Sequence, residues 1–309
     1  MSETDLEYPA GLREIAQIAS AKIGSNLAAY VPGLAPHAVK WIGSLSANGD
    51  HDYFLHSQAF PMLLLPWWLE TSLCGRPDHD FQAELVYASM SGYYFTRIID
   101  DLMDRDRLPE SPVLPALIYF HTEFERSYQG LFAHSDPFWD DFRRYSYEAA
   151  DSASRDAALS SVTEKDFDDT SSRKVAGAKI AVAAVCHHHG RADVLPAWAE
   201  VVDGLGRWHQ MLNDMVGWIG DFEHDQQTYF LSHARNRANT LAMSLPEWIL
   251  RYGIDWGAER LEASMAAVRG TASRLDSPPL VSYLDQRQRQ SDQQWAKLKV
   301  SLATLPALG

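Results

Sequence analysis

Hydrophobic residues recur along the chain mainly at the three- and four-residue spacing of amphipathic helices, and no convincing run alternates with the two-residue period of a strand. Breakers such as Gly75-Arg-Pro, Ser135-Asp-Pro and Ser277-Pro-Pro divide this pattern. The pattern predicts helices over residues 8–29, 59–75, 81–104, 112–133, 136–153, 171–188, 193–220, 222–234, 244–268 and 277–302.

No internal repeat and no long linker separates these helices, so we expect one all-α domain over residues 1–309. The polar stretch 152–172 is expected to be a mobile loop, and Asp166 to Asp169 within it a solvated segment and helix cap. His187-His-His-Gly190 is typical of a helix C-terminus. Consecutive helical residues point in different directions, which disfavours a metal site made of these histidines.

Composition narrows the class of protein. Hydrophobic residues make up 46% and charged residues 22%, as in ordinary soluble proteins. With a net charge of −14 no basic footprint is visible, so nucleic-acid binding is not expected. Cys74 and Cys186 are too few for a disulfide framework and fit a reducing cytoplasm. The acidic start lacks a signal-peptide core, and the apolar stretch 60–69 is too short to span a bilayer. We therefore expect a cytoplasmic protein without a membrane span.

A cluster of carboxylates follows an apolar and aromatic segment. Asp100 and Asp104 lie one helical turn apart, and Asp101 lies beside them. Such carboxylates repel one another unless a cation lies between them. Hard oxygen ligands without nearby Cys or His favour Mg²⁺, which usually bridges carboxylates to substrate phosphates. This cluster is therefore a candidate magnesium site.

A second polar helix face is found about 110 residues later in the chain. Asn213, Gly217 and Asp221 recur at a four-residue spacing, so Asn213 and Asp221 offer oxygen ligands on one face while Gly217 leaves room for water. Each segment alone is compatible with a solvated helix face. Together, flanked by apolar residues, they favour two walls that hold one diphosphate through metal ions.

The paired segments resemble the class I isoprenoid synthase superfamily, which comprises trans-prenyl diphosphate synthases and class I terpene cyclases. Residues 61–106 resemble the region that ends in the DDxxD motif, and residues 205–214 and 228–231 resemble the region around the second motif. The resemblance implies an antiparallel helical bundle with a deep central apolar pocket. It also implies three Mg²⁺ ions held with the diphosphate by one set of ligands: Asp100, Asp101, Asp104, Asn213 and Asp221.

Two departures from the family pattern favour a cyclase. Chain elongators carry a basic segment that binds the second diphosphate, whereas residues 56–61 here contain no Lys or Arg. The second motif is closer to the cyclase triad Asn-Asp-x-x-Ser-x-x-x-Glu, with Gly217 in place of Ser and Asp221 in place of Glu.

The resemblance also suggests residues that bind the substrate. Arg173 and Lys174 lie near where the family places a base that senses diphosphate, with Lys179 as a further candidate; ordinary surface basicity at a helix start is the alternative. Late basic candidates are Arg235, Arg237 and the pair Arg251-Tyr252. Aromatic and polar residues near the two motifs are expected to shape the pocket, with plain core packing as the alternative. They are Tyr93, Phe95, Thr96, Trp208 and Trp218.

The sequence therefore favours a Mg²⁺-dependent class I terpene cyclase that ionises a linear prenyl diphosphate, with C15 and C20 chains as the expected substrates. The second hypothesis is a prenyltransferase that joins an allylic diphosphate to isopentenyl diphosphate or another acceptor. A third is a non-enzymatic protein, either a catalytically silent helical partner subunit or a prenyl-lipid binder. Dimerisation is common in this superfamily, so the resemblance leaves a homodimer open.

Overall fold

The structure is a computed structural model that describes residues 8–45, 53–56, 59–104 and 111–303, without the side chains of Asp104 and of residues 298–303. Throughout these ranges the regular elements are helices, with no strand among them. The predicted all-α fold class is therefore confirmed. None of the helices described is long and apolar enough to cross a membrane.

Contacts divide the described residues into two compact units. The N-terminal unit consists of residues 8–147 and 177–196, and the C-terminal unit of residues 148–176 and 197–303. The expectation of a single domain stays a prediction.

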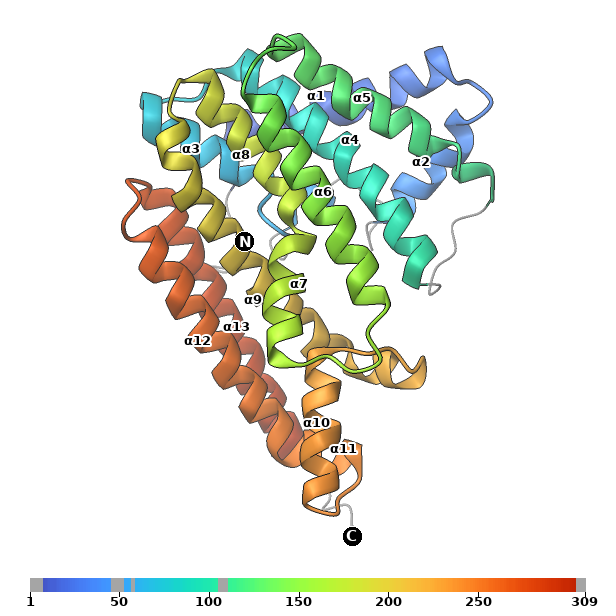
Figure 1. Cartoon of the computed structure of the whole chain (residues 1–309), viewed down its shortest axis with the longest axis vertical. Helices are drawn as coiled ribbons and strands as arrows, with labels where there is room; N and C mark the ends of the chain where they lie inside the picture. Colours follow the sequence, from blue (N-terminus) through green and yellow to red (C-terminus); the bar gives the residue numbers. More distant parts are fainter. Residues whose placement is uncertain (1–7, 46–52, 57–58, 105–110, 304–309) are drawn as a thin grey trace. The chain divides into compact units, whose positions relative to one another are not determined.

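The N-terminal unit is built around the long helix α4 (His79–Asp104), which packs against α1 (Ala10–Tyr30) and α5 (Ala116–Leu131) (Figure 1). The other helices of this unit are α2 (Ala35–Ser44), α3 (Leu64–Cys74), the first part of α6 (Phe138–Ala157) and α8 (Ala176–His188). At Gly92 a Cβ would lie 2.8 Å from the Phe124 ring, so α4 and α5 approach closely. This contact fixes the helix that carries the first acidic cluster.

The C-terminal unit is built around α9 (Leu195–Glu223). Its other helices are α7 (Glu164–Lys174), α10 (Tyr229–Thr240), α11 (Leu245–Trp248), α12 (Ile254–Ala272) and α13 (Pro278–Ala303). A short turn joins α12 to α13, and the two run side by side in opposite directions (Figure 1). Cβ atoms placed on Gly204 and Gly257 would lie 2.5 Å from Val268 and 2.4 Å from Met215, so α9 and α12 pack tightly.

The expected loop over residues 152–172 is wrong. Helix α6 continues to Ala157, and α7 begins after Thr163, which forms a reciprocal capping box with Asp166. The buried face of α7 contains Thr170, Ser171 and Ser172, and each of these hydroxyls donates to the carbonyl four residues earlier. A face of small polar residues gives no hydrophobic period, which explains why the pattern did not reveal this helix.

Other boundaries also differ from the prediction. The short helix α2 was not expected, although its Trp41 is buried. The single helix expected over 244–268 is divided into α11, a π-helical turn at Ile249–Gly253 and α12. The expected C-terminus at the histidine run is confirmed, because α8 ends at His188 and Gly190 has a φ of +62°.

Candidate active site

The first acidic cluster lies in the last turns of α4, where adjacent carboxylates have different surroundings. Asp101 is buried and accepts from the Arg97 guanidinium at 2.8 Å and from the Trp41 indole N–H at 3.4 Å. Asp100 is exposed. The Asp104 side chain lies outside the described part of the chain. Asp100 is therefore the more exposed of the two carboxylates, and Arg97 and Trp41 hold Asp101 at the end of α4.

Aromatic rings line the turns of α4 that precede this cluster. Tyr93 stacks on Tyr53 with ring centroids 4.9 Å apart, and burial, reinforced by Tyr53, raises its pKa. Phe95 meets the His121 ring edge to face at 5.0 Å. Thr96 is exposed, and its hydroxyl donates to the Tyr93 carbonyl at 3.0 Å. Tyr93 is thus a protonated, largely apolar group two turns before Asp100.

The second motif lies on α9 in the C-terminal unit. Asn213 and Gly217 are exposed, and Asp221 is half-buried. A Cβ on Gly217 would lie 3.6 Å from Oδ2 of Asp221, so the carboxylate folds back over the glycine toward the preceding turn. Asn213, Gly217 and Asp221 follow one another at a four-residue spacing on the continuous helix α9, and the Asp221 carboxylate lies next to Gly217 on that face.

Asp214 lies next to Asn213 on α9 and was not among the residues predicted for the site. It is buried, and Oδ1 accepts from the Gln210 amide at 2.7 Å. Burial raises its pKa to about 7, Lys174 opposes this shift, and the negative charge of Asp221 adds to it. The signal was present in the Asn-Asp pair of the motif, but its burial cannot be read from spacing alone.

The basic candidates Arg173 and Lys174 lie in the last turn of α7, not at the start of a helix as expected. Cations at a helix C-terminus complement the helix dipole, so no special function is needed to explain them there. Lys174 forms an ion pair with Asp156 and also acts electrostatically on Asp214. These contacts bring Lys174 to the neighbourhood of the α9 motif within the C-terminal unit.

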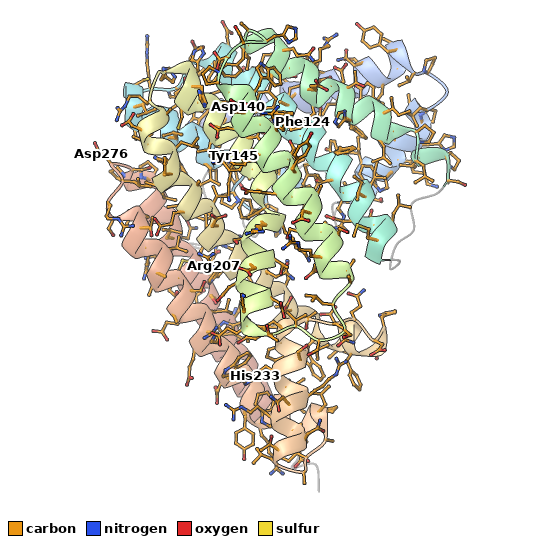
Figure 2. All side chains as sticks on the ribbon, in the orientation of Figure 1. Phe124, Asp140, Tyr145, Arg207, His233 and Asp276 are labelled. Atoms are coloured by element: carbon orange, nitrogen blue, oxygen red, sulfur yellow. The ribbon has the colours of Figure 1, made fainter. Side chains whose placement is uncertain are left out.

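The other candidates have structural partners. Trp208 is buried, and the Arg287 guanidinium lies over its ring at 4.9 Å; Trp218 is half-buried. Lys179 of α8 is buried above the ring of Tyr145, a residue marked in Figure 2, at 5.3 Å. Of the late arginines, Arg235 donates to Gln227 at 2.6 Å and Arg251 pairs with Glu247 at 3.0 Å, whereas Arg237 is exposed.

The donors on both motifs fit Mg²⁺ in chemistry, since all are carboxylate or amide oxygens. Among the residues described, however, no group of three or more His, Cys, Asp or Glu side chains is close enough to hold a metal ion. Mg²⁺ typically takes one or two carboxylates and completes its shell with water and substrate phosphates. The chemistry of the donors thus agrees with Mg²⁺, and the metal site itself stays a prediction.

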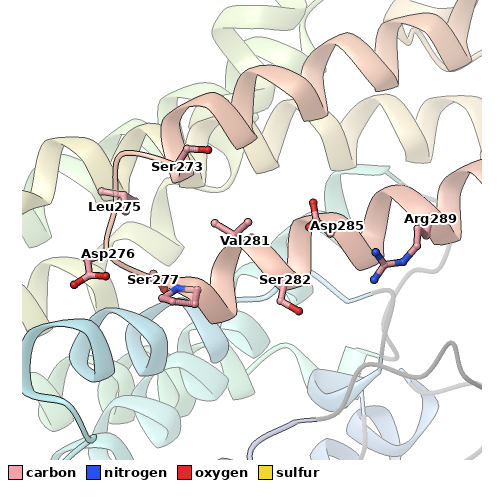
Figure 3. A pocket seen from close by; sticks show the side chains of 9 residues that line it. Ser273, Leu275, Asp276, Ser277, Val281, Ser282, Asp285 and Arg289 are labelled. Atoms are coloured by element: carbon pink, nitrogen blue, oxygen red, sulfur yellow. The ribbon is translucent and has the colours of Figure 1, made fainter.

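Two cavities are found in the C-terminal unit. One of about 460 Å³ lies at the turn between α12 and α13, where Figure 3 shows Asp276, Asp285 and Arg289 around it. The other, of about 260 Å³, lies between α7, α9 and α12. Neither is lined by Asn213 or Asp221, and the deep apolar pocket stays a prediction.

No family model and no curated protein matches the chain by sequence. Solved structures do resemble it. A geranylgeranyl pyrophosphate synthetase from the archaeon Geoglobus acetivorans aligns with a TM-score of 0.66 at 16% identity, over 93% of this chain and 99% of that one. A geranylgeranyl pyrophosphate synthase aligns with a TM-score of 0.68 at 13% identity, over 92% and 98%.

A third similar structure contains ligands. It is a polyprenyl synthase from Caulobacter crescentus CB15 in complex with calcium and isoprenyl diphosphate, with a TM-score of 0.57 at 13% identity over 94% of this chain and 98% of that one. At such identities the likeness concerns the fold. The chain thus shares its helical fold with these prenyl diphosphate synthases, in agreement with the fold that the resemblance implied.

Proposed function

We propose that the chain is a Mg²⁺-dependent enzyme that ionises an allylic prenyl diphosphate and transfers the prenyl group to an acceptor. Proteins named as prenyl diphosphate synthases share its fold over nearly the whole chain. One of them binds isoprenyl diphosphate together with calcium, a divalent cation that also prefers oxygen ligands.

The observation that carries the proposal is the shared face of Asn213 and Asp221 over Gly217. Two oxygen donors flank a position without a side chain, which suits a metal ion that keeps part of its water shell. Asp100 offers an exposed carboxylate on α4, in the part of the chain that resembles the DDxxD region.

The residues of the chain would bind and position the substrate. We propose that Asp100, Asp101 and Asp104 hold Mg²⁺ on one wall and that Asn213 and Asp221 hold it on the other. Mg²⁺ held by these residues would supply positive charge to the departing diphosphate. Lys174, with Arg173, supplies positive charge toward the diphosphate, while the Tyr93 ring excludes water and offers a π face to the allylic cation.

Cyclisation is the second candidate, and specific residues favour it. The α9 motif keeps the cyclase-like order of Asn213, Gly217 and Asp221. The stretch 56–61, of which Ser57 and Gln58 lie outside the described residues, contains no Lys or Arg for a second diphosphate. For prenyl transfer, the same absence favours an acceptor that carries no diphosphate of its own.

The test is to incubate the purified chain with Mg²⁺ and C10, C15 or C20 allylic diphosphates, with and without isopentenyl diphosphate or a neutral acceptor. Diphosphate release that requires an acceptor, with a lengthened or prenylated product, supports transfer. Release with a new hydrocarbon from one substrate alone supports cyclisation. No release under any condition would contradict both and favour the non-enzymatic hypothesis.

Variants connect turnover to the motifs. Asp100→Asn and Asp221→Asn should each lower kcat/KM by roughly 100-fold or more, because each removes charge that acts on the leaving group. Asp140→Asn is the matched control, since Asp140 is an exposed helical carboxylate paired only locally with Arg143. Turnover that survives Asp100→Asn unchanged would exclude this metal site.

A further inference from the structure

The cavity of about 260 Å³ between α7, α9 and α12 lies apart from the residues assigned to the diphosphate. All its lining residues belong to the C-terminal unit. Met211, Ala263, Ala267 and Val268 give it an apolar surface, and Gly204, which approaches Val268 closely, also lines it.

Charged residues toward two sides of this cavity already have partners. Glu200 accepts from the Thr271 hydroxyl at 2.9 Å and from Arg274 at 3.4 Å. Arg260 forms an ion pair with Glu164, and its guanidinium lies 5.9 Å from the centre of the Tyr229 ring. These groups are committed to the protein and frame the cavity.

Arg207 and Asp168 line the same cavity from α9 and α7 without such partners. Figure 2 marks Arg207 on α9 beside α7. Within the described part of the chain, neither side chain forms a hydrogen bond or an ion pair, although each lies within electrostatic reach of the other. Partial burial raises the pKa of Asp168, and Arg207 opposes that shift. The cavity thus offers one cation and one anion above an apolar surface.

We propose that this cavity binds a small zwitterion with an apolar body, of the class of α-amino acids with hydrocarbon side chains. The ligand carboxylate pairs with the Arg207 guanidinium, whose fork matches a carboxylate in two parallel hydrogen bonds. The ligand ammonium pairs with Asp168. The side chain lies against Met211, Ala267 and Val268.

The charges around the cavity favour a zwitterion over a small anion. A phosphate would bring about two negative charges, whereas Arg207 is one cation, Arg260 is already paired with Glu164, and Asp168 and Glu200 would repel the second charge. A direct exposed pair between Arg207 and Asp168 contributes little in water. A ligand with a carboxylate, an ammonium group and an apolar group would pair with Arg207, with Asp168 and with the apolar surface at the same time.

The experiment measures binding to the full chain by titration calorimetry, with leucine, methionine and phenylalanine as probes. Leucinamide and N-acetylleucine each lack one of the two charges, and inorganic phosphate tests a simple anion. We expect saturable binding of at least one amino acid and affinity weakened about tenfold or more for both blocked analogues, because each loses a charge-assisted hydrogen bond.

Arg207→Gln and Asp168→Asn should each weaken binding of that amino acid by about tenfold or more. Arg155→Gln is the control, since Arg155 is an exposed residue of the same unit paired with Asp151, and it should bind like wild type. The proposal is overturned if no probe binds saturably, if binding survives both substitutions, or if phosphate binds as well as the amino acid. The readout is independent of turnover.

Discussion

Asp100 and Asp101 show how adjacent residues of one motif can serve different purposes. Asp101 is 6% exposed and is held by Arg97 and Trp41, whereas Asp100 is exposed. Removing a buried carboxylate leaves the charge of its partner without a counter-charge, which destabilises the fold. Asp101 therefore stabilises the end of α4 as well as belonging to the candidate metal site.

We predict that Asp101→Ala lowers the free energy of unfolding by about 1–2 kcal/mol, a value reduced from that of a fully buried pair because the Arg97 side chain is 37% exposed. Asp100→Ala should change it by less than about 0.5 kcal/mol. Urea unfolding of both variants measures the difference. Equal stability of the two variants would show that the ion pair of Asp101 with Arg97 does not contribute to the free energy of unfolding.

His209 gives a pH dependence of stability. Burial, with help from the positive charge of Arg287, lowers its pKa from 6.5 to about 3. As pH falls below 6.5 the unfolded chain takes up a proton that the folded chain refuses, so stability falls over the window from 6.5 to about 3. Asp214 has the opposite effect on stability. Its pKa of about 7 lies above the ordinary value of 3.8, so as pH falls the folded chain takes up this proton before the unfolded chain does, and stability rises.

Comparison with a variant isolates the histidine. Between pH 7 and pH 5, wild type should lose up to about 2 kcal/mol of stability relative to His209→Gln, which does not titrate in this range. Urea unfolding of both proteins at the two pH values measures this difference. If the two proteins respond identically to pH, the histidine is not held neutral by the fold.

At the scale of elements, the sequence predicted long helices well and close helix contacts poorly. Helices α1, α4 and α9 follow the three- and four-residue hydrophobic spacing, and their bounds agree with expectation within a few residues. Helix α7 was missed because it packs through small polar residues. A Cβ on Gly206 would lie 2.8 Å from the Ser171 carbonyl and 2.5 Å from Val175, so α7 and α9 approach nearly backbone to backbone.

Gly206→Ala should therefore destabilise the protein by about 1–3 kcal/mol, because the added methyl group must push α7 away. This outweighs the gain of up to about 1 kcal/mol expected from replacing glycine in a helix. Gly220→Ala on the same helix is the control, since nothing lies within 4 Å of its added Cβ, and it should be neutral or stabilising. Thermal or urea unfolding of both variants distinguishes packing from propensity.

In the candidate site too, some residue positions can be predicted from helical spacing, whereas others depend on how the helices pack. The one-face arrangement of Asn213, Gly217 and Asp221 follows from helical spacing and agrees with the structure. The burial of Asp214 and the position of Lys174 at the end of α7 depend on how α7 packs on α9. No local pattern encodes that contact, so the sequence alone placed these residues less well.

At the scale of the whole molecule, the net charge of −14 opposes an anionic substrate. The proposed function requires metal ions to reverse this field locally, with ligands contributed by α4 and α9. The ions and the diphosphate should then bind cooperatively, because the charge of each offsets the repulsion that opposes binding of the other. Mg²⁺ or inorganic diphosphate alone should stabilise the fold only slightly.

Mg²⁺ and inorganic diphosphate added together should stabilise the fold by about 2.7 kcal/mol when the ligand concentration is 100 times the apparent Kd. Thermal unfolding detects this stabilisation as a raised Tm. If both helices serve one ligand, Asp100→Ala and Asp221→Ala should each abolish most of this joint effect, and the double variant should lose little more. Asp140→Ala is the control and should keep it. Additive partial losses from the two variants would instead indicate two independent cation sites, because uncoupled sites contribute separately to the free energy of unfolding.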